Sequence, residues 1–253
     1  MAKPAPPRRA REAATPADGP MVLYGRNAVH EALRGPRAVK RVWATERAAR
    51  EPWLRAAAAA VQVVSPEEVE RRCGSPDHQG ICAEVAPYRY ADADALLAAP
   101  DALIVALDEI QDPQNLGAIC RTAECAGATG VVIPERRSAE VTPAVCKASA
   151  GAVEHLRIAR VRNLADFLLE ARKAGAWSYG AAGDARTGYA QPDYRGKVVL
   201  VMGSEGSGLR PRVARSCDEL IALPLRGRIG SLNVSAAAAA LLYEITRQRA
   251  ARA

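Results

Sequence analysis

Aromatic side chains are scarce in this sequence, where they make up 4% of the 253 residues and include a single phenylalanine. Proteins that read splayed RNA bases stack those bases on rows of exposed aromatic rings. So few rings argue against a stacking surface of that kind. If RNA is the ligand, basic side chains and backbone groups are expected to make most of the contacts.

Metal-binding and disulfide patterns are missing as well. The six cysteines form no C-x-x-C pair and show no Cys/His spacing of a zinc site. They are Cys73, Cys82, Cys120, Cys125, Cys146 and Cys217. Several lie inside apolar runs, which indicates reduced and mostly buried thiols in a reducing compartment. We therefore expect no bound metal.

Long hydrophobic runs are also lacking. No stretch approaches the length of a membrane span, and the first residues contain no apolar segment of a secretory signal. These absences predict a cytoplasmic protein that binds no membrane. A formal charge of +7 and a pI near 9.3 favour an anionic partner such as nucleic acid.

The chain divides into a tail and two α/β units. Residues 1–20 contain five prolines and several basic residues but almost no large apolar side chains, which predicts a disordered basic tail. That tail either touches RNA phosphates or only keeps the protein in solution. Residues 21–90 alternate strands and helices, including one alanine-rich helix over 47–60. Residues 91–102 form a linker before a larger unit over 103–253.

The larger unit predicts a mostly parallel sheet that helices cover on both faces. Three polar loops follow its strands, at 108–115, 203–209 and 224–233, and a helix over 116–126 follows the first loop. Ligands of such sheets bind at the carboxyl ends of the strands. The glycines of 203–208 do not match G-x-G-x-x-G, and this loop comes late in the chain. A nicotinamide oxidoreductase is therefore a disfavoured alternative.

Together the loops resemble the SpoU (TrmH-type) branch of the SPOUT RNA methyltransferases. The similar segments are 112–121 (DPQNLGAICR), 202–209 (MGSEGSGL), and 223–225 (LPL) with 231–235 (SLNVS). Residues 24–29 (YGRNAV) and 78–81 (HQGI) resemble the L30e-like substrate-binding domain of the ribosomal RNA members, such as the RlmB-like enzymes. The resemblance to the methyltransferase domain covers roughly 103–250.

This resemblance implies an α/β fold of the SPOUT type, with a C-terminal trefoil knot and a small N-terminal L30e-like domain. It also implies S-adenosylmethionine as cofactor, a homodimer whose active site uses both subunits, and ribosomal RNA as partner. The implied reaction is 2′-O-methylation of a guanosine ribose in 23S ribosomal RNA. A transfer RNA methyltransferase and a non-catalytic RNA-binding protein remain as alternatives.

The resemblance also assigns cofactor-binding residues in the second and third loops. They are Gly203, Glu205, Gly208, Leu223, Leu225 and Leu232. The implied catalytic residues are Asn115, Arg121, Glu205, Ser231 and Asn233. From the sequence alone, Asn115 and Asn233 could equally cap helices, and Glu205 could satisfy backbone N–H groups of its own turn.

Helical periodicity places Arg121 on the solvent side, so the residues by themselves indicate a surface arginine. The resemblance makes it catalytic, and a guanidinium with a pKa above about 12 suits a phosphate clamp that stabilises a developing alkoxide better than a general base. Candidate RNA contacts are Arg26, His78, Arg226 and Arg228. His78 is equally expected as a structural turn residue, and the two loop arginines as solvated side chains.

Overall fold

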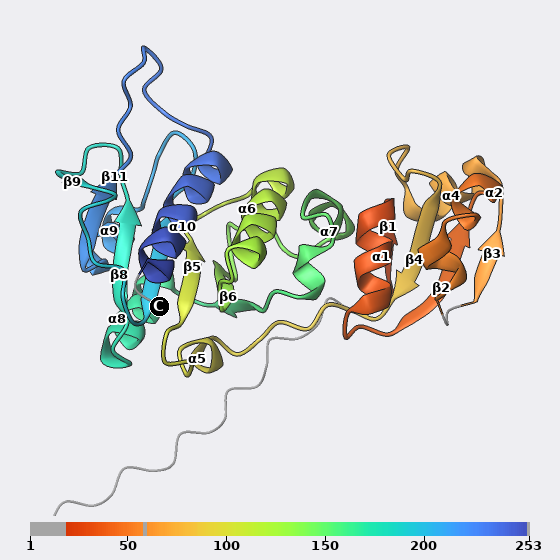
Figure 1. Ribbon diagram of the computed structural model, residues 1–253, viewed down its shortest axis with the longest axis horizontal. Helices are drawn as coiled ribbons and strands as arrows, with labels where there is room; N and C mark the ends of the chain where they lie inside the picture. The colour runs from red at the N-terminus through yellow and green to blue at the C-terminus, as the bar shows by residue number, and fades with distance from the viewer. Residues whose placement is uncertain (1–18, 58–59, 252–253) are drawn as a thin grey trace, which may run out of the picture.

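Two β-sheets, joined by an extended connection, make up the protein in the computed structural model, which describes residues 19–57 and 60–251 (Figure 1). The predicted basic tail lies almost wholly outside the described residues. The first unit contains β1 (Met21–Tyr24), α1 (Arg26–Arg34), β2 (Val39–Ala44), α2 (Glu46–Ala49), α3 (Pro52–Arg55), β3 (Val61–Val63), α4 (Pro66–Cys73) and β4 (Ile81–Val85). Its sheet order is β1-β4-β2-β3.

The prediction of one helix over 47–60 was wrong. Two short helices, α2 and α3, replace it, and the second ends at Arg55. Pro52 is the reason, because proline lacks the N–H that a continuing helix needs but fits the first turn of a new one. High alanine content favours a helix but cannot carry it through a proline.

The second unit begins after the short helix α5 (Ala93–Leu96) in the connection. Its elements are β5 (Leu103–Leu107), α6 (Pro113–Cys125), β6 (Gly130–Pro134), α7 (Pro143–Ala148), the 3-10 helix η1 (Ala152–Glu154), β7 (Ile158–Val161), α8 (Leu164–Lys173), β8 (Trp177–Ala181), β9 (Thr187–Gly188), β10 (Val198–Met202), α9 (Pro211–Ser216), β11 (Glu219–Ala222) and α10 (Val234–Ala250). The sequence did not predict the two-residue strand β9.

The seven strands are ordered β7-β6-β5-β10-β8-β11-β9, and every pairing is parallel. The predicted parallel sheet is confirmed. Strands β5 and β10 pair along their whole length at its centre, from Val198 opposite Leu103 to Met202 opposite Leu107. This register brings the loops that follow β5 and β10 out at the same edge of the sheet.

Helix α6 begins three residues earlier than predicted. Asp112 is its N-cap, because the Asp112 side chain accepts a hydrogen bond from the backbone N–H of Gln114, and Pro113 occupies the first turn. Asn115 therefore lies inside the helix and is not its cap. Its side chain is left available for the site described below.

The two units share one hydrophobic core. Buried side chains of the first unit, including Leu23 and Val29, belong to the same cluster as Cys120 and Val145 of the second. Helix α1 lies beside α7, so the small sheet packs directly on the large unit (Figure 1). No helix within the described ranges is both long and apolar enough to cross a membrane.

Candidate functional site

A cavity of about 250 Å³ opens at the carboxyl ends of β8, β10 and β11. All six residues that the sequence predicted to bind a cofactor line this cavity. They are Gly203, Glu205, Gly208, Leu223, Leu225 and Leu232. Three separate loops and the first turns of α10 supply its walls. From the sequence alone, these loops could be placed only at the same edge of the sheet.

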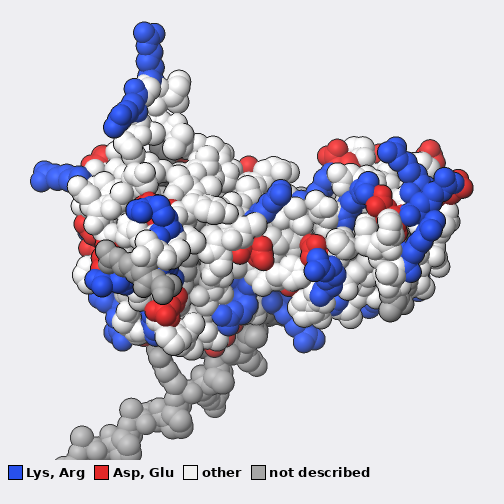
Figure 2. All heavy atoms as spheres, in the orientation of Figure 1, with Lys and Arg blue, Asp and Glu red and all other residues white. Residues whose placement is uncertain are grey.

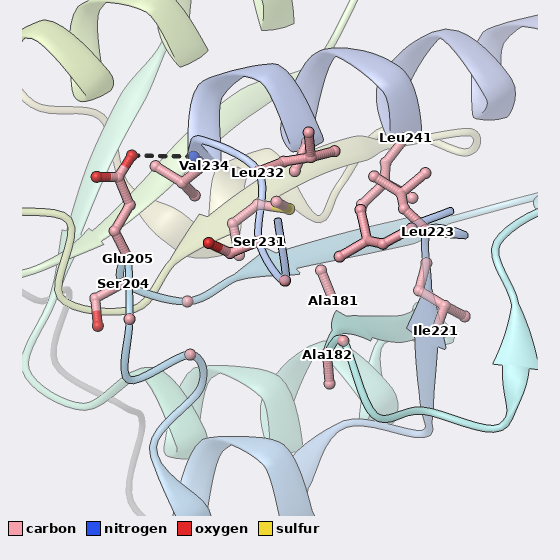
Figure 3. Close-up of a pocket in the computed structure, with 18 residues that line it drawn as sticks. Ala181, Ala182, Ser204, Glu205, Ile221, Leu223, Ser231, Leu232, Val234 and Leu241 are labelled. Atoms are coloured by element: carbon pink, nitrogen blue, oxygen red, sulfur yellow. Dashed lines mark hydrogen bonds between the residues drawn. The ribbon is translucent and has the colours of Figure 1, made fainter. Parts of the chain in front are cut away.

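The cavity has an apolar end and a polar end. Ile221, Leu223 and Leu241 lie together at one end, and Ser204 and Glu205 lie at the other (Figure 3). The lining residues include one carboxylate and no lysine or arginine. Such walls suit a flat heterocycle with a positively charged group better than a phosphate-bearing ligand.

Glycines let the backbone of 203–209 turn back on itself beside the cavity. A Cβ built on Gly203 would lie 2.2 Å from the carbonyl carbon of Gly208 and 2.4 Å from the nitrogen of Leu209. Gly206 and Gly208 have φ values of 84° and 65°, which glycine adopts without steric cost. Two backbone hydrogen bonds between Ser204 and Gly208, of 3.1 and 2.9 Å, close the loop.

Glu205 is the centre of a polar cluster at the rim. Its Oε1 accepts hydrogen bonds from Asn115 Nδ2 at 3.2 Å, from Asn233 Nδ2 at 2.5 Å and from the backbone N–H of Val234 at 3.2 Å. Asn233 Nδ2 also donates to Asn115 Oδ1 at 2.9 Å. One predicted residue from each of the three loops therefore meets in a single hydrogen-bonded group, which we call the Asn115–Glu205–Asn233 trio.

The two roles predicted for Asn233 coexist. Its Oδ1 accepts from the backbone N–H groups of Ser235 and Ala236 and so caps α10. Its Nδ2 belongs to the trio. Because the acceptor and the donor of one amide are used separately, capping does not compete with the site.

A second cavity of about 310 Å³ adjoins the first and shares Ser204, Glu205 and Val234 with it. Its other walls are Glu109, Ile110, Gln111, Asp112, Asn115 and Ser207. Of the trio, Glu205 lines both cavities and Asn115 lines the second. This position allows Glu205 to contact ligands in both.

Arg121 lies apart from these groups. It is exposed on α6 and makes no hydrogen bond or ion pair with the described residues. It lines neither cavity. Six residues separate it from Asn115, which is about 9 Å along a helix axis. The structure of one chain does not bring Arg121 into the site.

The third loop projects away from the body of the protein (Figure 1). Ser231 lines the first cavity, whereas Arg226 and Arg228 are exposed on the projection. Basic side chains gather at its tip, and none of them is covered by the rest of the molecule (Figure 2). Ile229 beside them is 76% exposed, which is unusual for an isoleucine.

Of the two RNA contacts predicted in the first unit, Arg26 forms an ion pair with Glu51 but keeps almost half of its side chain exposed. His78 accepts a hydrogen bond from the backbone N–H of Gly80 through Nδ1 at 2.9 Å. This bond makes His78 part of the turn before β4, and its predicted contact with RNA stays a prediction. Arg26 and His78 lie on a different unit from the cavities.

Sequence reasoning missed two contributions to the site. The first cavity is also lined by three small residues at the end of β8, Ala181, Ala182 and Gly183. The small side chains at this strand end were the only sequence signal for them. Asp108 and Arg210 form an ion pair behind the loops, and neither residue stood out in the sequence because 102 positions separate them. Only the fold shows that both groups belong to the site.

Two buried thiols, those of Cys120 and Cys146, are not activated as nucleophiles. Burial raises the pKa of Cys120 and Cys146 to about 12, so both remain protonated at neutral pH. Within the described residues, no group of three or more histidine, cysteine, aspartate or glutamate side chains could hold a metal ion.

Comparison with known sequences adds two family matches. The sequence model of the SpoU rRNA Methylase family matches residues 102–243, and that of the RNA 2′-O ribose methyltransferase substrate-binding domain matches residues 22–91. The first match spans all three loops of the site. The second spans the four-stranded sheet except for Met21, the first residue of β1.

Similar proteins agree with these matches. A Bacillus subtilis protein assigned to the TrmH family of tRNA/rRNA methyltransferases is 39% identical over 90% of this chain and 95% of its own length. An uncharacterised tRNA/rRNA methyltransferase of Synechocystis is 42% identical over 90% of this chain, which spans 62% of that protein. The AdoMet-bound rRNA methyltransferase from Sinorhizobium meliloti is 28% identical and superposes with a TM-score of 0.75, covering 90% of this chain and 87% of its own.

Proposed function

The chain belongs to the SpoU rRNA Methylase family, and from this premise we propose that it uses S-adenosylmethionine to methylate the 2′-hydroxyl of a guanosine ribose in 23S ribosomal RNA. One observation carries the proposal. Every predicted cofactor residue lines a single cavity, and Asn115, Glu205 and Asn233 meet at the rim of that cavity. A tRNA target is the second candidate, because relatives carry tRNA/rRNA names.

The residues of the cavity fit the proposed cofactor. Aliphatic side chains at one end suit an adenine ring, and glycine backbone allows close approach. The absence of lysine and arginine from the walls suits a sulfonium cation. When bound, S-adenosylmethionine supplies an activated methyl group.

The protein's own part in the reaction is to hold the ribose hydroxyl in place and accept the change in charge. We assign Asn115 and Glu205 to this positioning because the trio is already assembled through three hydrogen bonds to Glu205 Oε1. Glu205 Oε2 accepts no hydrogen bond from the described residues, so it remains available to a ribose hydroxyl. Ser231 offers a further hydroxyl from the wall of the cofactor cavity.

We propose that Arg121 serves the site of a second subunit in a homodimer. Its exposure and its lack of partners within the described part of one chain support this role. In that position its guanidinium would hold an RNA phosphate by two hydrogen bonds and stabilise negative charge on the ribose oxygen.

A dimer of two different inactive chains tests the role of Arg121. Arg121→Ala and Glu205→Ala carry different affinity tags and are co-expressed, and the mixed dimer is isolated through both tags. If Arg121 acts across the interface, one of the two sites combines the wild-type Glu205 of one chain with the wild-type Arg121 of the other. That site is intact, so we expect about half of wild-type turnover. Turnover no higher than in either single variant would mean that each arginine serves its own chain. A monomer by light scattering would refute the dimer.

The RNA is expected to contact the basic loop and the small sheet. Arg226 and Arg228 on the projecting loop support phosphate contacts, and Arg26 supports a contact on the first unit. The match of residues 22–91 to a substrate-binding domain supports the division of labour between a binding unit and a methyltransferase unit.

Methyl transfer from labelled S-adenosylmethionine tests the proposed function directly. Ribosomal RNA that lacks the modification and unmodified tRNA are offered in parallel, and the labelled nucleotide is mapped. We expect one labelled guanosine, carrying a 2′-O-methyl group, in 23S RNA. Label in tRNA alone would favour the second candidate. Cofactor binding without transfer to either RNA would contradict both.

We also propose that the C-terminal segment is knotted, as the resemblance implies. The strand order supports it, since β10 lies between β5 and β8 although it follows β8 in the chain. Segment 223–250 then returns to pack α10 on α6. An experimental electron-density trace through residues 181–245 tests this path.

A further inference from the structure

One residue holds both ends of the glycine loop 203–209. The backbone N–H of Asp108 donates to the carbonyl oxygen of Met202 at 2.8 Å, directly before the loop. The Asp108 side chain accepts two hydrogen bonds from Arg210, directly after the loop. Oδ2 accepts from the Arg210 backbone N–H at 2.8 Å, and Oδ1 accepts from Nε at 2.8 Å and forms an ion pair with Nη2 at 2.7 Å.

The carboxylate of this pair is held from both of its oxygens. The Asp108 carboxylate is fully buried, whereas 41% of the Arg210 side chain is exposed, and Arg210 is the sole side chain of the described residues that donates to it. The guanidinium bond to Oδ1 and the backbone bond to Oδ2 together define the orientation of the carboxylate as well as its distance. Hydrogen bonding to Asp108, opposed by partial burial, raises the pKa of Arg210, so the cation persists at every working pH.

Both ends of the Asp108–Arg210 pair lead to the active site. Asp108 is the first residue of the loop that leads through Glu109 into α6, which carries Asn115, and Arg210 follows the loop that contains Glu205. Arg210 Nη1 also approaches Glu109 Oε1 at 3.4 Å, on the wall of the second cavity. Within the described residues, Asn115 and Glu205 are joined directly by one hydrogen bond of 3.2 Å and indirectly through Asn233, so the Asp108–Arg210 pair adds a second tie between the two loops.

Resting on the proposed function, we propose that Asp108 and Arg210 are positioning residues for methyl transfer. They close loop 203–209 over the cofactor cavity and hold Glu205 in register with Asn115. Neither Asp108 nor Arg210 lines either cavity, and the pair contributes no group to the chemistry. Its effect passes through Glu205.

Substitutions at Arg210 test this role in the full-length protein. Arg210→Gln removes the cation and the Nε donor but keeps the backbone N–H, and Arg210→Lys keeps a cation without the Nε donor. Arg212→Gln is the matched control, because Arg212 lies two residues further on and makes an equally close ion pair with Asp166, at 2.6 Å on the surface. We expect kcat to fall roughly 10²-fold for glutamine, less for lysine, and not for the control.

Two further measurements separate positioning from general damage. The dissociation constant of S-adenosylhomocysteine, measured by calorimetry without RNA, should rise for Arg210→Gln while the KM for RNA changes little. In a double-mutant cycle, Arg210→Gln should lower kcat much less when Glu205 is already glutamine. If the fold-losses in kcat of Arg210→Gln and Glu205→Gln simply multiply in the double variant, the two residues act independently and the proposal is overturned. Equal kcat and equal cofactor affinity in the Arg210→Gln and Arg212→Gln variants would overturn it as well. If Arg210→Gln does not fold, both measurements are made on Arg210→Lys. An inactive wild type would instead count against the proposed function.

Discussion

Asn233 shows how one side chain serves stability and function at once. Its carbonyl oxygen caps α10, and its amide nitrogen donates to both Asn115 and Glu205. Asparagine is one of the best capping residues, but serine caps a helix almost as well without an amide donor. The two roles can therefore be separated by substitution.

We expect Asn233→Ser to keep the stability of the wild type and Asn233→Ala to lower the free energy of unfolding by about 1 kcal/mol. Both should lose most methyl transfer, because neither has the amide nitrogen that donates to Asn115 and Glu205 while the amide oxygen caps the helix. Chemical denaturation and the labelled methyl assay measure the two properties. Wild-type turnover in the serine variant would reduce Asn233 to a helix cap.

At the scale of elements, loop 203–209 depends on a close approach of backbone to backbone. Gly203 has no room for a Cβ against Gly208 and Leu209, neither of which is a flexible side chain. Gly227 in the projecting loop has no such neighbour, since the nearest atom to its Cβ position is the nitrogen of Ile229 at 4.0 Å. The pair of glycines therefore offers a matched comparison.

Gly203→Ala should open the loop and weaken cofactor binding roughly tenfold or more, which corresponds to about 1.4 kcal/mol. Gly227→Ala should leave that affinity unchanged. Calorimetry with S-adenosylhomocysteine gives both values, and circular dichroism checks that the two variants are folded. Equal affinities would show that the tight turn is not needed for the cofactor.

At the scale of the whole molecule, a buried ion pair fastens the small sheet to the large unit. The Arg37 guanidinium contacts both carboxylate oxygens of Glu154, and one of these bonds, from Nε to Oε2, is 2.8 Å long. The Arg37 side chain is 8% exposed and the Glu154 side chain is fully buried. Tyr88 adds a hydrogen bond to the carbonyl of Leu156 across the same interface.

Breaking this pair from one side leaves a buried charge without its partner. We expect Glu154→Gln to lower the free energy of unfolding by about 3 kcal/mol and the double variant Arg37→Met, Glu154→Met to lower it less. Arg34→Gln is the control, because Arg34 is exposed and lies 3.4 Å from Glu31. Denaturant titration measures all three, and a double variant worse than the single one would contradict the argument.

Much of the fold could be predicted from the sequence because local signals agree with it. The strand Leu103–Leu107 is an uninterrupted apolar run, and Ser65 with Pro66 marks the start of α4 as predicted. The errors arose where one local signal prevailed over another that had been given more weight. Pro52 split the alanine-rich helix, and Asp112 started α6 before the apolar periodicity became visible.

The sequence by itself determined the chemistry of the loops: which residues carry carboxylates and amides, where glycine allows a tight turn, and which family the motifs resemble. Tertiary structure alone decided which of these groups meet. Asn115, Glu205 and Asn233 are 90 and 28 positions apart along the chain, and they touch because the strands before them run parallel in one sheet. The exposure of Arg121 was predicted from helical periodicity, which is a local pattern. The contact between Asp108 and Arg210 was not, since side-chain contacts across 102 positions depend on strand order and register, which no local pattern encodes.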